Sequence, residues 1–180
     1  LEEFRRCWIH PDLRQELLAS LPDAARSAEL MRALQPFPSA ALTRARTERW
    51  LLTQCYANDC MMGECAHASI AVMRYLAVCE RPDAADRLAR HIELLRRRRD
   101  GQGRWRGMPF YYALLALQTD APTARDELLY AAPACERALH LLRPADPYTP
   151  RRQAILQVAL ALAKPEHDLG AAETRGLDDD

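Results

Sequence analysis

The chain has 180 residues, of which 49% are apolar and 28% are charged, and its formal net charge is zero. This size and composition are typical of one soluble globular domain. A net charge of zero argues against a general electrostatic attraction to nucleic acid or to an anionic membrane, and no apolar run approaches the roughly 20 residues needed to cross a bilayer.

Helical patterns fill the first part of the chain. Short helices are predicted over residues 2–9, from Pro11 and from Pro22, because proline suits the first turn of a helix. Ser39 is a favourable N-cap for a longer helix that runs towards Tyr56.

Three helices are predicted in the middle of the chain. The helical pattern breaks at Gly63, and residues 66–78 after it are nearly all apolar. Residues 83–98 form the clearest amphipathic helix, because apolar side chains recur on one face at helical spacing. Residues 110–117 are apolar or aromatic throughout, so we expect this helix and the one at 66–78 to be surrounded by other helices.

The last part of the chain has three more helical patterns. They cover residues 123–131, 133–142 and 153–163, and a proline-rich loop at 144–150 precedes the last one. Residues 166–180 are acidic and poor in large apolar side chains, so we expect a tail that is disordered or loosely docked.

No stretch of the sequence is typical of a β-strand. Alternation of polar and apolar residues is absent, and β-branched residues are few. Short linkers favour antiparallel packing of neighbouring helices. We therefore expect a single all-α domain over residues 1–165, built of stacked antiparallel helical hairpins in an α/α superhelix or a partial toroid-like bundle.

The turn after the arginine run resembles a known family. Asp100-Gly101-Gln102-Gly103-Arg104-Trp105, followed by Gly107 and an apolar helix, is similar to the turns of α/α-toroid proteins, the terpenoid cyclases and protein prenyltransferases. The resemblance covers residues 100–118 and occurs once. It implies helical hairpins around a cavity for a small apolar ligand.

The six cysteines raise the question of a metal site. They are scattered through helical patterns in a chain too large to need disulfides, which indicates reduced cysteines in a cytoplasmic protein. Cys55, Cys60, Cys65 and His67 are potential zinc ligands. On one continuous helix Cys55 and Cys60 would point about 140° apart. We therefore interpret the cysteines as core residues and expect no bound metal or other cofactor; Cys60, Cys65 and His67 are the candidates if one is bound.

A polar cluster lies at the start of the helix at 66–78. Asn58, Asp59, Glu64 and His67 form this cluster, in which carboxylates beside an imidazole can transfer protons or orient a metal ligand. The same carboxylates can instead cap the positive end of the helix, and we favour this interpretation.

The arginine run offers a third candidate site. Arg104 and Arg106 flank Trp105 close to the four arginines at 96–99, and arginines around an aromatic ring can grip phosphates and stack on bases. A solvated face with ion pairs is the interpretation that zero net charge favours, so we expect no nucleic-acid partner. Trp105 is expected to pack against the turn that contains it.

Three function hypotheses follow from these features. The leading one is a non-catalytic all-α module that binds an unknown protein partner or a second copy of itself as a homodimer. The second is a small-molecule pocket between the helices at 66–78 and 110–117, with or without enzymatic activity, that uses His67, Tyr111 and Tyr112. The third is nucleic-acid binding through the arginine cluster. The candidate ligand-binding residues are Asp59, Glu64, His67, Arg104, Trp105, Tyr111 and Tyr112.

Overall fold

The computed structural model describes residues 23–37, 41–63, 65–119, 121–144 and 146–164. Within these ranges the protein is all-α, as predicted, and contains no β-strand. No helix in the described part is long and apolar enough to span a membrane. The predicted helices at 2–9 and from Pro11, the N-cap Ser39 and the predicted tail lie outside the described residues.

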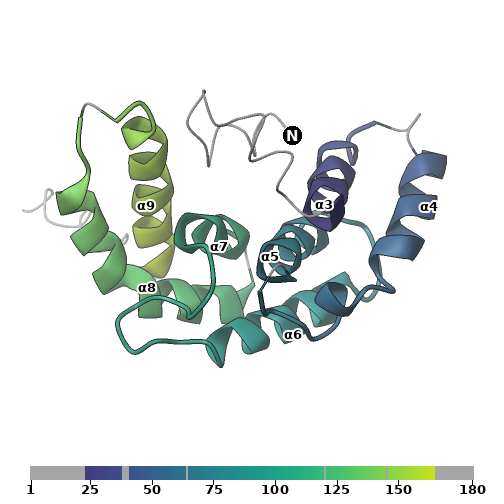
Figure 1. Ribbon diagram of the computed structural model, residues 1–180, viewed down its shortest axis with the longest axis horizontal. Helices are drawn as coiled ribbons and strands as arrows, with labels where there is room; N and C mark the ends of the chain where they lie inside the picture. Colours follow the sequence, from purple (N-terminus) through teal and green to yellow (C-terminus); the bar gives the residue numbers. More distant parts are fainter. Residues whose placement is uncertain (1–22, 38–40, 64, 120, 145, 165–180) are drawn as a thin grey trace, which may run out of the picture.

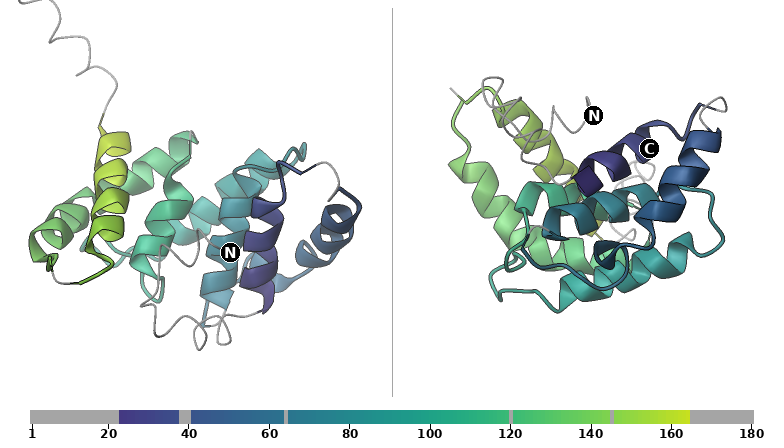
Figure 2. Two further views of the ribbon diagram at one scale, coloured as in Figure 1. Left: turned by 90° about the horizontal axis from the view of Figure 1, so that it is seen from above. Right: turned by 45° about the vertical axis from the view of Figure 1, so that its right-hand side comes forward.

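The described helices are spread along the long axis of the molecule, with the helix at 41–51 at one end and the helices at 122–141 and 149–163 at the other (Figures 1 and 2). Helix α3 packs on α5, α5 on α7, and α7 on α9, while α6 packs on α8. Helix α8 also packs on α9, and a short 3-10 helix, η3, packs on α5. The bounds are α3 (Asp23–Ala33), α4 (Ala41–Leu51), η3 (Cys55–Ala57), α5 (Cys65–Leu76), α6 (Ala84–Arg96), α7 (Phe110–Leu117), α8 (Pro122–Leu141) and α9 (Thr149–Ala163).

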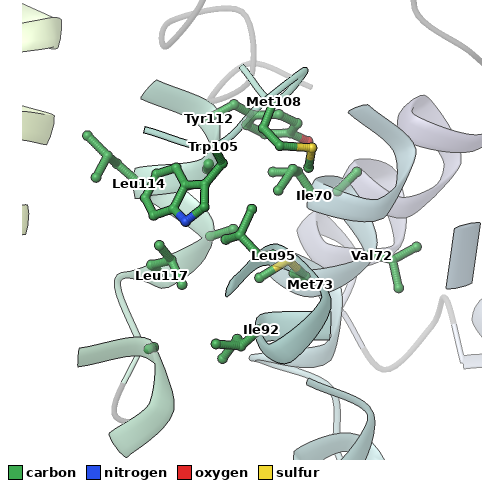
Figure 3. Packing of buried hydrophobic residues seen from close by; sticks show 14 of the residues in the cluster. Ile70, Val72, Met73, Ile92, Leu95, Trp105, Met108, Tyr112, Leu114 and Leu117 are labelled. Atoms are coloured by element: carbon green, nitrogen blue, oxygen red, sulfur yellow. The ribbon is translucent and has the colours of Figure 1, made fainter. Parts of the chain in front are cut away.

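Helices α5 and α7 form the centre of the core, in agreement with their apolar sequences. All residues of α5 except Cys65 and His67 are buried. Helix α6 buries one face through Leu88, Ile92 and Leu95, as its periodicity predicts. Figure 3 shows the side chains of these three helices and of the following turn converging in one cluster. Burying a large apolar side chain contributes about 1.5–3 kcal/mol, so this cluster is the main source of stability.

The prediction of one helix from Ser39 towards Tyr56 is wrong at its C-terminal end. Helix α4 stops at Leu51, and the chain turns before the 3-10 helix begins at Cys55. Polar side chains compete for the carbonyls of the last turn: Thr53 Oγ1 donates to Trp50 O at 2.7 Å, and Gln54 Nε2 donates to the same oxygen at 3.1 Å. Such local bonds offer the backbone an alternative to continuing the helix.

The predicted break at Pro133 is also wrong, because α8 is continuous from Pro122 to Leu141. Pro133 is exposed, so its ring and missing N–H lie on the solvent side. Burial of Leu128, Ala131, Cys135 and Ala138 continues at helical spacing through the proline. Packing of this face outweighs the local cost of the proline. The last helix, predicted from residue 153, begins at Thr149 with a proline in its first turn.

A buried ion pair ties α3 to the core. Arg74 Nε lies 3.3 Å from Glu29 Oε1, and both side chains are almost fully buried. The Tyr112 hydroxyl donates to the same Glu29 oxygen at 2.5 Å, and Arg32 Nε donates to Oε2 at 3.2 Å. Burying a carboxylate is tolerated only with such partners, so these contacts fix the position of α3 on α5 and α7.

Candidate functional site

The turn after α6 folds back on the end of that helix. The Asp100 carboxylate accepts hydrogen bonds from the backbone N–H groups of Gln102 (2.7 Å) and Arg104 (3.0 Å), and these bonds lower the pKa of Asp100. The Arg106 N–H donates to Arg98 O at 2.8 Å. These hydrogen bonds hold the turn together and fix it to the end of α6. The arginines of this region project to two different sides of the turn.

Gly103 fixes this turn against α8. Its φ angle is 84°, in the left-handed region that favours glycine. A Cβ atom at Gly103 would lie 2.9 Å from the Ala134 Cβ and 3.3 Å from Tyr130 O. Gly107, in the same turn, has a φ of 71° but open space around it. Only glycine therefore allows the turn to approach α8 this closely at position 103.

On the α8 side of the turn, Glu127 is fully buried and gathers three donors. Arg96 Nε lies 2.9 Å from Glu127 Oε1, Arg99 Nη2 lies 2.8 Å from the same oxygen, and Trp105 Nε1 donates to Oε2 at 2.9 Å. Trp105 is itself 3% exposed and lies in the core cluster shown in Figure 3. This side of the arginine run is therefore closed, with each charge matched.

On the other side of the turn, the structure has a pocket of about 570 Å³. It lies between the loop before α5, the C-terminal end of α6 and the turn. Three guanidinium groups and one carboxylate line it, together with a cysteine and three apolar side chains. The lining residues are Asp59, Cys60, Met61, Met62, Leu94, Arg97, Arg98 and Arg106.

Only one of the three guanidinium groups in this pocket has an ion-pair partner within the described residues. Arg97 pairs with Glu93 at 3.4 Å and is 70% exposed. Within the part of the chain that the structure describes, the guanidinium groups of Arg98 and Arg106 make no ion pair and no hydrogen bond. The Asp59 carboxylate likewise has neither within those residues. The pocket thus has an excess of positive charge and free guanidinium donors.

Three thiols meet at the edge of the pocket. The Sγ atoms of Cys55, Cys60 and Cys65 all lie within 4.8 Å of one another, and those of Cys55 and Cys65 are 3.8 Å apart. Cys55 is exposed, and Cys60 and Cys65 are half-buried, so the group is open to solvent. Sulfur atoms this close can bind one soft metal ion together. The end of α4 at Leu51 is what allows this arrangement.

Backbone hydrogen bonds hold the loop that carries these thiols. The carbonyl of Cys55 accepts from the N–H groups of Asn58, Asp59 and Cys60, each at 3.1 Å. The buried Ser69 hydroxyl lies 2.5 Å from Cys60 O, which it can reach as a donor. The loop is therefore fixed from within and from α5.

A second buried side chain anchors the same loop from α6. His91 Nε2 lies 3.2 Å from Tyr56 O, and Ser69 Oγ lies 2.8 Å from that oxygen. His91 Nδ1 lies 2.9 Å from Arg87 O. Burial lowers the pKa of His91, so its neutral form is favoured and one ring nitrogen carries the proton.

The thiols differ in their ease of ionisation. A hydrogen bond from the Met62 backbone lowers the pKa of Cys60. Burial, with hydrogen bonds and charge repulsion from the other two thiols, raises the pKa of Cys65 to about 12. Cys60 therefore loses its proton more readily than Cys65, and three thiolates together require a compensating positive charge.

Of the residues predicted as one polar cluster, Asp59 lines the pocket and His67 does not. His67 lies in the first turn of α5, half-buried, and burial lowers its pKa; it is not a member of the three-thiol group. Glu64 lies outside the described residues. The candidate metal ligands from the sequence were Cys60, Cys65 and His67, whereas the group in the structure consists of Cys55, Cys60 and Cys65.

The aromatic candidates and Arg104 lie elsewhere. The Arg104 guanidinium stacks 4.6 Å from the centroid of the Phe110 ring. Tyr111 is half-buried beside Phe110 and below Arg152, whose guanidinium carbon lies 5.6 Å from the Tyr111 ring centroid. Tyr112 is fully buried and bonded within the core. None of them lines the pocket described above, and neither does Trp105.

Several residues of this region were not candidates from the sequence. Leu94, Met61 and Met62 carry no signal that separates a pocket wall from an ordinary core position. Which arginines of the run face inward also depends on Glu127, which lies 28 or more residues further along the chain.

Comparisons of the chain with protein-family models, with curated proteins and with solved structures find no match.

Proposed function

We propose that the protein is an all-α binding module that takes a small anionic ligand into the pocket beside Cys60. The observation that carries this proposal is the pair Arg98 and Arg106, two guanidinium groups without an acidic partner among the described residues that line the same pocket. Arginine presents a planar fork of donors that matches a carboxylate or a phosphate.

The rest of the pocket supports a ligand with an apolar body. Met61 is almost fully buried, Met62 is 64% exposed, and Leu94 completes the apolar wall. Methionine side chains are flexible and adapt to irregular apolar shapes. The volume of about 570 Å³ lies in the usual range of roughly 300–1,000 Å³ for small-molecule sites.

The order of helix contacts supports a finer description of the fold. Alternate helices α3, α5, α7 and α9 contact one another in series, and α6 contacts α8 beside them (Figure 1). This is the arrangement expected of stacked antiparallel helical hairpins. On this proposal the pocket lies where a loop, a helix end and a turn meet at one side of the stack.

Direct binding measurements test the ligand class. Inorganic phosphate, octanoate and octyl phosphate are titrated by calorimetry at low salt, and we expect octyl phosphate to bind most tightly because it uses both the arginines and the apolar wall. Replacing Arg98 and Arg106 by Ala should weaken this binding at least about tenfold, since each charged hydrogen bond contributes roughly 1.5–3 kcal/mol.

Two controls make the result interpretable. Arg90→Ala removes an exposed arginine of α6 that does not line the pocket, and it should bind octyl phosphate as the unmodified chain does. A short single-stranded DNA tests the nucleic-acid alternative. The proposal fails if no probe binds, if the double variant binds normally, or if the DNA binds more tightly than all the small anions.

A further inference from the structure

The chain brings three cysteines together from three local structures. Cys55 begins η3, Cys60 lies in the loop after it, and Cys65 begins α5. Each is a free cysteine, and no disulfide joins any pair of them. Cys65 packs at the edge of the core, but Cys55 is exposed and Cys60 is half-buried, so core packing alone does not account for the meeting of three thiols at one point.

The distances suit one shared ion. With Zn–S bonds of about 2.3 Å and tetrahedral angles, two sulfur ligands of one zinc ion lie about 3.8 Å apart. The Cys55 and Cys65 sulfurs are 3.8 Å apart, and the third sulfur lies within 4.8 Å of both. A small movement of Cys60 completes the arrangement.

The start of α5 offers partial compensation for negative charge in the thiol group. Cys65 is the first residue of α5, where the positive end of the helix dipole lies. Gly63, with a φ of 53°, makes the reversal between Cys60 and the helix possible.

The loop is also held in advance of any ligand. Ser69 is fully buried and contacts the carbonyls of both Tyr56 and Cys60, and the carbonyl of Cys55 accepts three backbone N–H groups. Outer contacts of this kind orient metal ligands and are part of the design of metal sites. The cost of ordering the loop is therefore met largely by the fold itself.

We infer that Cys55, Cys60 and Cys65 form a binding site for one zinc ion, held by three thiolates with a fourth position open to an exogenous ligand. No fourth histidine, cysteine or carboxylate belongs to the group among the described residues. Sites that keep one position open can bind water or another small ligand there. This inference differs from the sequence-based expectation that the cysteines are core residues without metal.

The charges balance in a way that links the site to the pocket. Each thiol gives up its proton to solvent on binding, so three thiolates and one Zn²⁺ carry a net charge of −1. Cys60 lines the same pocket as Arg98 and Arg106. Their unmatched positive charge lies close to the excess negative charge of the loaded site, which stabilises it.

Metal titration of the reduced full chain tests the inference. The protein is stripped with a chelator, kept in a phosphine reductant and titrated first with cobalt(II) and then with zinc. We expect one equivalent of cobalt to give the thiolate-to-cobalt charge-transfer bands and the visible bands of a tetrahedral site, and one equivalent of zinc to abolish them. Cys60→Ser and Cys65→Ser should lose these bands, while Cys79→Ser, a half-buried cysteine outside the group, keeps them.

A second readout needs no variant. Zinc should protect Cys55, Cys60 and Cys65 from iodoacetamide at least about tenfold by mass spectrometry, and should leave the alkylation of Cys79 unchanged. The chain with Arg98 and Arg106 replaced by Ala should retain one zinc, which separates this test from that of the anionic ligand. Absence of thiolate bands together with no protection, a disulfide as the only product, or binding of copper(I) without zinc would overturn the assignment.

Discussion

Arg96 and Arg99 project to one side of the turn after α6, and Arg98 and Arg106 project to the other. The first pair meets Glu127, fully buried, with the Trp105 indole as a third donor. The second pair meets a solvent-accessible pocket and no acidic partner within the described residues. A buried charge must be matched to be tolerated, whereas an accessible one can stay unmatched and receive a ligand. We call these the closed side and the open side.

Removal of Glu127 should break the closed side. Glu127→Ala leaves the two arginines and the Trp105 N–H without their acceptor, and we expect the free energy of unfolding to fall by about 3–5 kcal/mol. Chemical denaturation measures the change.

The matched control is the adjacent exposed carboxylate, Asp126, whose side chain is 65% exposed and also pairs with Arg96. Asp126→Ala should cost less than about 1 kcal/mol. Similar losses in the two variants would show that burial does not distinguish these carboxylates.

The second test concerns how tightly the turn is pressed on the closed side. Gly103→Ala combines a left-handed backbone with a Cβ contact of 2.9 Å to Ala134, and we expect a loss of about 2–3 kcal/mol. Gly107→Ala has the backbone effect alone, because nothing lies within 4 Å, and should cost about 1–2 kcal/mol. The difference between the two losses in free energy of unfolding, measured by denaturation, reports the contact between position 103 and α8. Equal losses would show that this contact does not contribute.

The third test concerns the support of the open side. Burial lowers the pKa of His91, so the unfolded chain, with a histidine pKa of about 6.5, binds a proton more readily than the folded one. Stability should therefore be highest above that pH and fall as the pH drops from about 6.5 towards the folded pKa. In His91→Gln, denaturation at pH 7.5 and at 5.5 in a chelator should show a smaller difference than in the unmodified chain. If the loss of stability between pH 7.5 and 5.5 is the same in both chains, a group other than His91 causes the pH dependence.

The smallest effect on stability is expected at the open side itself. Arg98→Ala and Arg106→Ala should each change the free energy of unfolding by less than about 0.5 kcal/mol, because neither guanidinium has a partner within the described residues to lose. Thermal melting without added anions measures this. A loss as large as that of Glu127→Ala would show that these arginines also belong to the structural framework.

The sequence was sufficient for the elements whose side chains share one environment. Residues 66–78 and 110–117 are so largely apolar that a central position suits them, and the structure confirms that α5 and α7 lie in the core. The predicted burial of the first stretch ends at Leu76, because Ala77 and Val78 lie beyond α5 and are exposed. The periodicity of α6 likewise identified its buried face. In these cases local pattern and tertiary packing favour the same structure.

Prediction was weaker where distant residues decide the outcome. The sequence predicts a break at Pro133, because the local pattern does not show that α8 is buried on its neighbours. The sequence offers Cys55, Cys60 and Cys65 as potential zinc ligands but favours core residues, because a continuous helix would separate Cys55 from Cys60; the structure ends that helix at Leu51. The two sides of the arginine run depend on Glu127, which no local pattern connects with them.

Pro133 has a further consequence for α8. Proline has no N–H, so the carbonyl of Leu129, four residues earlier, has no helical donor, and both residues are exposed to water. Water can bond to that carbonyl in the donor's place. The longest described helix thus lacks one backbone hydrogen bond on its solvent-exposed face. Its two segments, before and after Pro133, should exchange their amide hydrogens at separate rates rather than as a single unit.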